Sequence, residues 1–185
     1  MDNWKYLTKK ANQAYTGNAF LVAVALNQQA LMYIEDSFNK KNDIDTGLIV
    51  AASTVSFLNI AGSYIALDDY MTAHIQYNNA MKFLHKIKEK FEINKLQSNF
   101  ILQTAVSIFF EWEIFSKKHG IKIPKNSRTM MNTFSNALIY PIQNHAHYLP
   151  ASNPGNLFRL LNNIKINHTA ETTTTFDTNG IKYVI

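Results

Sequence analysis

Two stretches of the chain carry the same ladder of small and bulky residues. Each ladder has an alanine, an aromatic residue nine positions later, and two more alanines three and ten positions after the aromatic residue. It occurs at Ala11, Phe20, Ala23 and Ala30, and again 50 residues later at Ala61, Tyr70, Ala73 and Ala80. Small residues at helical spacing let two helix backbones approach closely, and a bulky neighbour fills the adjacent groove. The duplication therefore predicts tandem pairs of packed helices.

The composition is that of a globular chain without disulfides. Apolar residues make up 46% of the 185 positions and charged residues 17%, which supports a substantial core within one domain. The absence of cysteine excludes disulfides and thiolate metal sites and fits a reducing compartment. The first five residues lack the basic and then apolar pattern of a signal peptide, so we expect a cytoplasmic protein.

Apolar residues recur at steps of three and four over most of residues 1–149, which we expect to form one helical domain. Asp45 is the expected N-cap of the third helix, and Asp68 and Asp69 separate the third helix from the fourth. A sixth helix should begin near Ser127 and be kinked or shortened by Pro141. The predicted helices cover about 2–15, 20–39, 45–67, 69–91, 95–118 and 127–148.

The segment 150–185 has a different character, and we expect it to form a C-terminal tail. Residues 154–164 predict a short helix, and the turn sequence at 177–180 predicts a β-hairpin. A lone hairpin is marginally stable, so the tail is expected either to dock on the helices or to move freely.

The third predicted helix holds a charge-free run at 48–67, which is near the length that spans a bilayer. Against insertion, the run contains several serine, threonine and asparagine residues, and aspartates flank it on both sides. A helix that is apolar on most sides also suits the centre of a helical stack. We therefore expect a buried helix and no membrane span.

The ladder resembles the tetratricopeptide repeat (TPR), in which each unit is a helix pair with small residues at the close contacts and an aromatic residue opening the second helix. The match covers residues 4–90, and a third pair at 95–148 fits loosely through Ala105, Phe134 and Ala137. The chain also resembles a small group of uncharacterised bacterial TPR-like proteins. The 50-residue step is longer than the usual step of about 34, and Asn27 replaces an expected aromatic residue. The resemblance implies an all-α antiparallel helix-hairpin repeat with about six main helices.

The resemblance also implies a non-catalytic protein-interaction module that binds a peptide on the face formed by the first, third and fifth helices. The matching groove positions are Lys5, Thr8, Asn12, Tyr15, Val55, Leu58, Asn59, Gly62, Ile65, Leu102, Val106 and Phe109. Members that clamp a peptide carboxylate need a lysine where this chain has Thr8, so we do not expect that clamp. A hydrophobic or helical peptide, or this chain's own tail, would suit such a groove.

Basic residues concentrate in the segment 82–128, which carries the whole excess of positive charge. The candidates for a basic patch are Lys82, Lys86, Lys90, Lys117, Lys118, Lys122 and Arg128. They could face nucleic acid or an acidic protein, or form a solvated surface enriched in lysine by codon bias. Phosphate-binding surfaces usually include arginine, so nucleic acid is not the expected partner. Self-association through the exposed end of the repeat is a third possibility.

No motif in the sequence predicts catalysis, a cofactor or a metal. His145 and His147 share one face if that segment is extended, but no third ligand lies near them in the sequence. Glu111 and Glu113 have no acid–base partner, and a solvated helix face is the expected role. His74 and His85 could share one face of a helix, but no carboxylate pairs with either of them by spacing. The chain has no phosphate-binding glycine loop and no nucleophile motif, so we do not expect an enzyme.

Overall fold

The structure is a computed structural model that describes residues 1–40, 45–90 and 93–123. These residues form an all-α fold, as predicted, and contain no strand. The helices are α1 (Asp2–Thr16), α2 (Phe20–Asn39), α3 (Thr46–Ala66), α4 (Tyr70–Lys90) and α5 (Lys95–His119), followed by the short 3₁₀ helix η1 (Gly120–Lys122). The predicted sixth helix and the tail at 150–185 lie outside the described residues.

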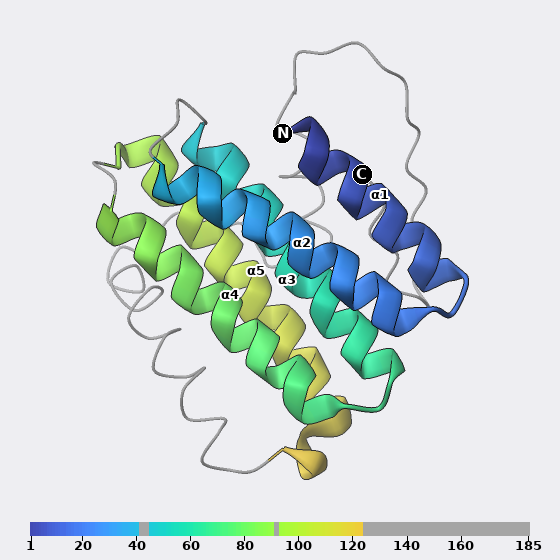
Figure 1. The fold of residues 1–185 in the computed structure, drawn as a ribbon. Helices are drawn as coiled ribbons and strands as arrows, with labels where there is room; N and C mark the ends of the chain where they lie inside the picture. The colour runs from blue at the N-terminus through green and yellow to red at the C-terminus, as the bar shows by residue number, and fades with distance from the viewer. Residues whose placement is uncertain (41–44, 91–92, 124–185) are drawn as a thin grey trace.

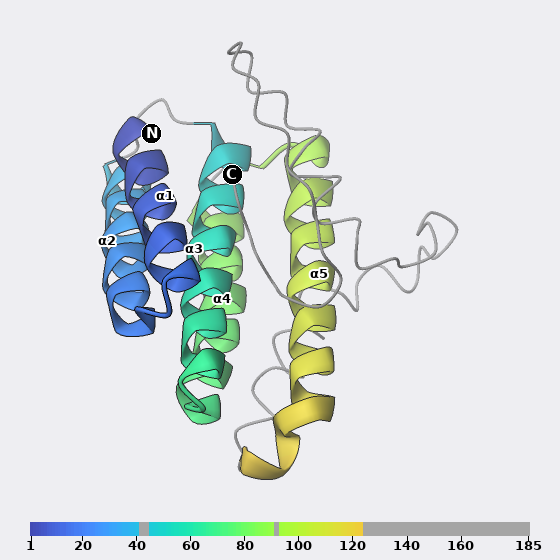
Figure 2. The same cartoon turned by 90° about the vertical axis from the view of Figure 1, so that its right-hand side faces the viewer.

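The five helices form two antiparallel hairpins followed by a single helix (Figure 1). Figure 2 shows the order of the stack, with the hairpin α1–α2 on one side, the hairpin α3–α4 in the middle and α5 on the other side. Helix α3 packs against α2, α4 and α5, whereas α1 packs mainly against α2. The second hairpin is therefore enclosed by neighbours, and the first hairpin forms one end of the stack.

The turns inside the two hairpins have the same backbone structure at a 50-residue offset. In each turn one residue adopts a left-handed conformation, Asn18 with φ 60° and Asp68 with φ 59°. The same four backbone hydrogen bonds close both turns. In the first turn the amides of Gly17, Asn18, Ala19 and Ala23 donate to the carbonyls of Gln13, Tyr15, Ala14 and Ala19, respectively. In the second turn the amides of Leu67, Asp68, Asp69 and Ala73 donate to the carbonyls of Ser63, Ile65, Tyr64 and Asp69. The duplication seen in the sequence thus extends to the hydrogen bonds of the turn.

The alanines of the ladder all lie in the interior. Ala23, Ala30 and Ala73 are completely buried, and Ala80 has 2% of its surface exposed. Because an alanine side chain is a single methyl group, it projects little from the helix, and the partner helix can approach closely at these positions. The placement agrees with the close-contact role that the spacing predicted.

Polar side chains define where the later helices begin. The carboxylate of Asp45 accepts a hydrogen bond from the Gly47 amide, which confirms Asp45 as the predicted N-cap of α3. Asp69 accepts a bond from the Thr72 amide at the start of α4, and hydrogen bonding from the Thr72 side chain and then from this amide lowers the pKa of Asp69. At the start of α5, Asn94 and Gln97 form a capping box.

Helix α3 is the centre of the fold. Every residue from 49 to 61 is buried, and the helix is long and apolar enough by composition to cross a membrane. However, 72% of its most apolar window is buried inside the protein. This burial is what the central helix of a helical stack shows, in agreement with the expectation from the sequence.

Two tryptophans tie this central hairpin to its neighbours. The indole of Trp4 on α1 donates a hydrogen bond to the Ser56 hydroxyl on α3 at 3.0 Å. The indole of Trp112 on α5 donates to Nδ1 of the fully buried His74 on α4 at 2.8 Å. Because an indole N–H can only donate, Nδ1 is the acceptor and a neutral His74 carries its proton on Nε2.

The Asn78 amide completes the contact around His74. Its side chain lies 3.0 Å from Nε2 of His74, and the buried amide oxygen would otherwise have no hydrogen-bond partner. We therefore assign the orientation in which this oxygen accepts the Nε2 proton. The arrangement holds α4 against α5 through a chain of neutral hydrogen bonds.

Candidate functional site

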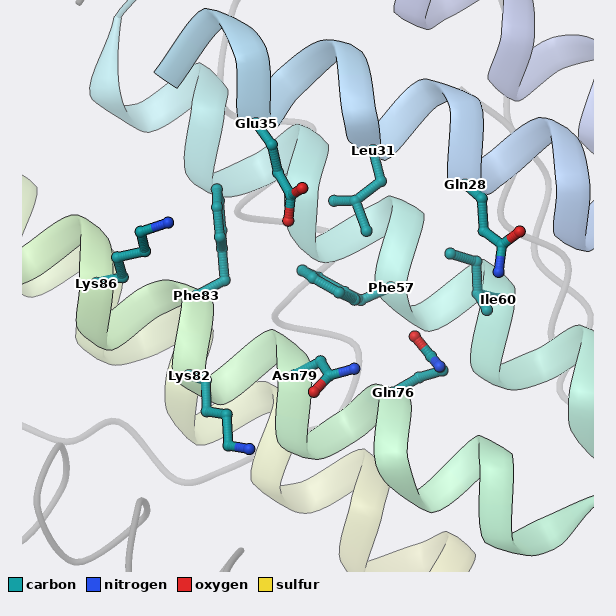
Figure 3. Close-up of a pocket in the computed structure, with 10 residues that line it drawn as sticks. All are labelled: Gln28, Leu31, Glu35, Phe57, Ile60, Gln76, Asn79, Lys82, Phe83 and Lys86. Atoms are coloured by element: carbon teal, nitrogen blue, oxygen red, sulfur yellow. The ribbon is translucent and has the colours of Figure 1, made fainter. Parts of the chain in front are cut away.

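An open groove runs between α2 and α4, with α3 beneath it (Figure 3). Its volume is about 440 Å³. The lining side chains come from α2 (Gln28, Leu31, Glu35), α3 (Phe57, Ile60) and α4 (Gln76, Asn79, Lys82, Phe83, Lys86). The groove lies on the side of the second helices of the hairpins and not on the face of the first, third and fifth helices that the resemblance implied.

The floor of the groove is apolar because the two hairpins meet there through bulky side chains. Phe83 packs its ring 5.3 Å from that of Phe38 and 6.1 Å from that of Phe57, measured between centroids. Leu31 and Ile60 continue this surface along the groove. Since these side chains belong to the hydrophobic core, the floor is held rigidly by the packing that builds the fold.

The two rims are polar and differ along their length. Figure 3 shows the amides of Gln28 and Gln76 at one end, and Glu35 opposite Lys86 at the other. Asn79 and Lys82 lie between them on α4. Amide groups both donate and accept hydrogen bonds, so one end suits a neutral polar partner and the other a charged one.

The three lysines of α4 that the sequence placed in one basic patch, Lys82, Lys86 and Lys90, have different roles. Lys90 donates to the carbonyls of Phe38 at 2.9 Å and of Asn39 at 3.4 Å, and its ammonium lies 4.1 Å from the centre of the Phe38 ring. It therefore satisfies the last carbonyls of α2. Lys82 and Lys86 are exposed and line the groove.

The predicted basic patch does not form one surface. Lys122 lies 4.4 Å from the centre of the Tyr70 ring at the start of α4, whereas Lys90 is the last residue of that helix. A helix of 21 residues is roughly 30 Å long, so the two groups of lysines are far apart. Lys117 forms an ion pair with Glu113 at 3.1 Å, and Lys118 is exposed. Arg128 lies outside the described residues.

The predicted groove on the first, third and fifth helices does not offer open surface at four of its positions. Thr8, Val55, Leu58 and Asn59 have between 3% and 8% of their surface exposed. The reason is the central place of α3, whose apolar residues serve the core on every side. Asn59 contacts the Asn27 side chain on α2 at 3.5 Å. The remaining described candidates are partly exposed, namely Lys5, Asn12, Tyr15, Gly62, Ile65, Leu102, Val106 and Phe109.

Two expectations, one about Glu111 and one about His85, were wrong. Glu111 is not on a fully solvated face but is half-buried, and this burial raises its pKa. Its charge also contributes, after burial, to the raised pKa of Tyr77. His85 does have a carboxylate at helical spacing, since its Nε2 lies 3.2 Å from Glu89. Glu113, by contrast, is paired with the exposed Lys117 as a surface residue.

At the C-terminal end of α5, aromatic and basic groups gather around one ring. His119 stacks on the Tyr70 ring with a centroid distance of 4.2 Å, and the Tyr70 hydroxyl donates to Asp68. Burial lowers the pKa of His119, and the charges of Lys118 and Lys122 lower it further. The contacts fix η1 and the end of α5 to the start of α4.

Within residues 1–40, 45–90 and 93–123, no three histidine, aspartate or glutamate side chains are grouped so that they could hold a metal ion. His145 and His147 lie beyond this part of the chain. The groove between α2 and α4 is thus the candidate site, and the chemistry it offers is apolar contact, amide hydrogen bonding and two cations against one carboxylate. Sequence reasoning singled out only Lys82 and Lys86 among its residues.

The comparisons with known proteins give a family and no function. No curated protein and no solved structure matches the chain. A family model described as protein of unknown function (DUF2753) matches residues 2–145, a region that includes all five described helices. The chain therefore belongs to the DUF2753 family.

Proposed function

We propose that this protein is a non-catalytic, TPR-like helical-repeat module that binds a peptide segment of a protein partner. The repeat is supported by the two hairpins, whose turns share one left-handed position and the same hydrogen bonds at a 50-residue offset. Stacked helical hairpins commonly present extended surfaces on which partners bind. No step of covalent chemistry is part of this proposal.

The groove between α2 and α4 is the surface on which we place the peptide. The observation that carries the proposal is its combination of a rigid apolar floor, at Leu31, Phe57, Ile60 and Phe83, with polar rims. Its volume falls within the range of about 300–1,000 Å³ that is common for binding pockets. An apolar side chain of the peptide would lie on the floor, while the rim amides would bond to the peptide backbone.

A display selection with random peptides tests this proposal, using the wild-type protein and two tryptophan variants. Asn79→Trp places a bulky ring in the groove, whereas Gln29→Trp places the same ring at the position 50 residues earlier, which is exposed and outside the groove. Peptides selected by the wild type should bind the Gln29 variant normally and lose most of their affinity for the Asn79 variant. Matching thermal melts would show that both variants fold.

The proposal is overturned if no peptide is enriched, or if both variants bind the selected peptides equally well. The same preparations separate the two other candidate functions. An electrostatic binder of nucleic acid would bind oligonucleotides with an affinity that falls steeply with salt. Self-association would appear as a dimer in light scattering, and exposed Val22 and Met32 on α2 are the residues that would support it.

A further inference from the structure

We infer that the groove selects peptides with an aspartate or glutamate side chain, held along the α4 rim where Lys82 and Lys86 lie. This inference rests on the proposed function, since it names the chemistry of the peptide that the groove would take. It does not follow from the apolar floor, which any apolar side chain could occupy. It follows from the distribution of charge along the rims.

The two lysines give the α4 rim of the groove its positive charge. Lys82 and Lys86 are four residues apart on α4, so their side chains leave the helix on the same face about one turn apart. Both line the groove, and Figure 3 shows them on the α4 side of it. A carboxylate that lies along this rim would be attracted by both positive charges and could accept a charge-assisted hydrogen bond from an ammonium group.

The opposite rim does not cancel this charge. Glu35 is the one acidic residue among the groove-lining side chains, which leaves an excess of one positive charge. Lys86 also lies 5.4 Å from the centre of the Phe38 ring, which holds its ammonium group over the edge of the floor. The other end of the groove is neutral, with Gln28 and Gln76, so a bound peptide would have a preferred direction.

The internal duplication indicates that the fold does not need these lysines. The positions 50 residues before Lys82 and Lys86 are Met32 and Asp36, on the same helix of the first hairpin. Both are exposed there, and neither lines the groove between α2 and α4. The first pair of equivalent positions holds methionine or lysine and the second pair holds aspartate or lysine, so packing does not fix either. The positive charge is particular to the α4 side of the groove.

A single acidic residue fits these observations better than a polyanion. Lys90 is bonded to the end of α2, and Lys117, Lys118 and Lys122 lie toward the other end of α4. The charge at the groove is therefore local, and Glu35 would repel a second phosphate or carboxylate nearby. The partner we infer is a peptide with one acidic side chain next to an apolar one.

Three peptides that differ at one position test this inference. A peptide that was selected with the wild-type protein is synthesised with Glu, Gln or Lys at its acidic position. If the selected peptide has no acidic residue, the three residues are placed at each of its positions in turn. Dissociation constants are measured by fluorescence anisotropy. We expect the Glu peptide to bind about 3- to 10-fold more tightly than the Gln peptide, and the Lys peptide to bind most weakly. The preference should shrink as NaCl rises from about 0.05 to 0.5 M.

Variants of the protein locate the preference. The double variant Lys82→Gln and Lys86→Gln should bind the Glu and Gln peptides equally, whereas Lys88→Gln, which removes an exposed charge outside the groove, should keep the preference. Glu35→Gln should increase it. Equal binding of the three peptides by the wild type, with Asn79→Trp still abolishing binding, would overturn this inference and leave the proposed function standing. If no peptide binds at all, both fail.

Discussion

The two hairpins of this protein share one backbone design and differ in nearly everything around it. Their turns have the same left-handed residue and the same hydrogen bonds. In the first hairpin, however, α1 buries only Trp4, Thr8 and Ala11, whereas α3 buries every residue from 49 to 61. The comparison shows that the hairpin geometry is set locally, while burial is set by the place of the hairpin in the stack.

The second hairpin also carries features that the first lacks. Asp69 caps α4 with its side chain, but the equivalent residue before α2 is Ala19, which makes no such bond. Within the described residues, a buried side-chain hydrogen bond ties the second hairpin to α5, through His74 and Trp112. The central hairpin is therefore held on both sides, and we expect it to tolerate change less well than the terminal one.

The largest expected effect comes from enlarging the buried alanines. Ala73→Leu should lower the free energy of unfolding by about 2–3 kcal/mol, because α3 is enclosed and cannot move away from the added atoms. Ala23→Leu should cost only about 1 kcal/mol, because α1 lies at the end of the stack and can shift outward. Urea unfolding of the two variants measures both values.

Ala25→Leu is the control for helix composition, since Ala25 is exposed on α2 and the change should alter stability by less than about 0.5 kcal/mol. Equal losses for the two buried alanines would contradict the view that the place in the stack decides how well a hairpin adapts.

A smaller effect is expected at the left-handed residues of the turns. Asn18→Gly should raise the free energy of unfolding by up to about 0.5 kcal/mol, because glycine adopts a positive φ without a steric penalty. Asp68→Gly should gain less or lose stability, because it also removes the acceptor of the Tyr70 hydroxyl. Thermal melts of the single and double variants would reveal whether the two turns respond independently. A larger gain in stability for the Asp68 variant than for the Asn18 variant would show that the Tyr70 contact contributes nothing.

The smallest expected effect concerns Glu111 on α5, whose charge acts on the buried Tyr77 of the second hairpin. Burial raises the pKa of Glu111 in the folded protein above its unfolded value, so folding becomes less favourable as pH rises through these two values. Glu111→Gln should therefore raise the melting temperature at pH 7 by roughly 1–2 °C and have no benefit at pH values below the unfolded pKa.

Glu113→Gln is the matched control, because Glu113 is paired with exposed Lys117 one turn away. It should leave the melting temperature unchanged or lower it slightly. A stabilisation of the Glu111 variant that is the same at all pH values would show that its charge is not the cause.

Much of the fold could be predicted from the sequence because local patterns determine it. The alanine ladder predicted the helix pairs, Asp45 was identified as a cap, and the ends of the five helices agree with the structure to within a few residues. These features depend on neighbours three or four residues away. The left-handed residues Asn18 and Asp68 were missed, although their 50-residue spacing carries the same repeat as the alanines.

The candidate site could not be predicted because it depends on which faces the stacked hairpins leave open. Phe57 and Phe83 follow the same apolar pattern as any core residue, and nothing in their spacing shows that they floor a groove. The buried environment of Glu111 and the bond from Lys90 to the Phe38 carbonyl likewise depend on contacts between distant segments. Sequence periodicity gives the buried face of a helix but not the gap between two helices.

The turns have a consequence for how such a chain can change over time. The four hydrogen bonds that the two turns share join main-chain atoms only, so side chains at most turn positions can be exchanged without altering the angle at which the helices meet. A unit of 50 residues closed in this way could be copied, inserted or lost as a block, with each copy keeping its shape while its outer surface drifts. The lengths of relatives should then differ in steps of one hairpin.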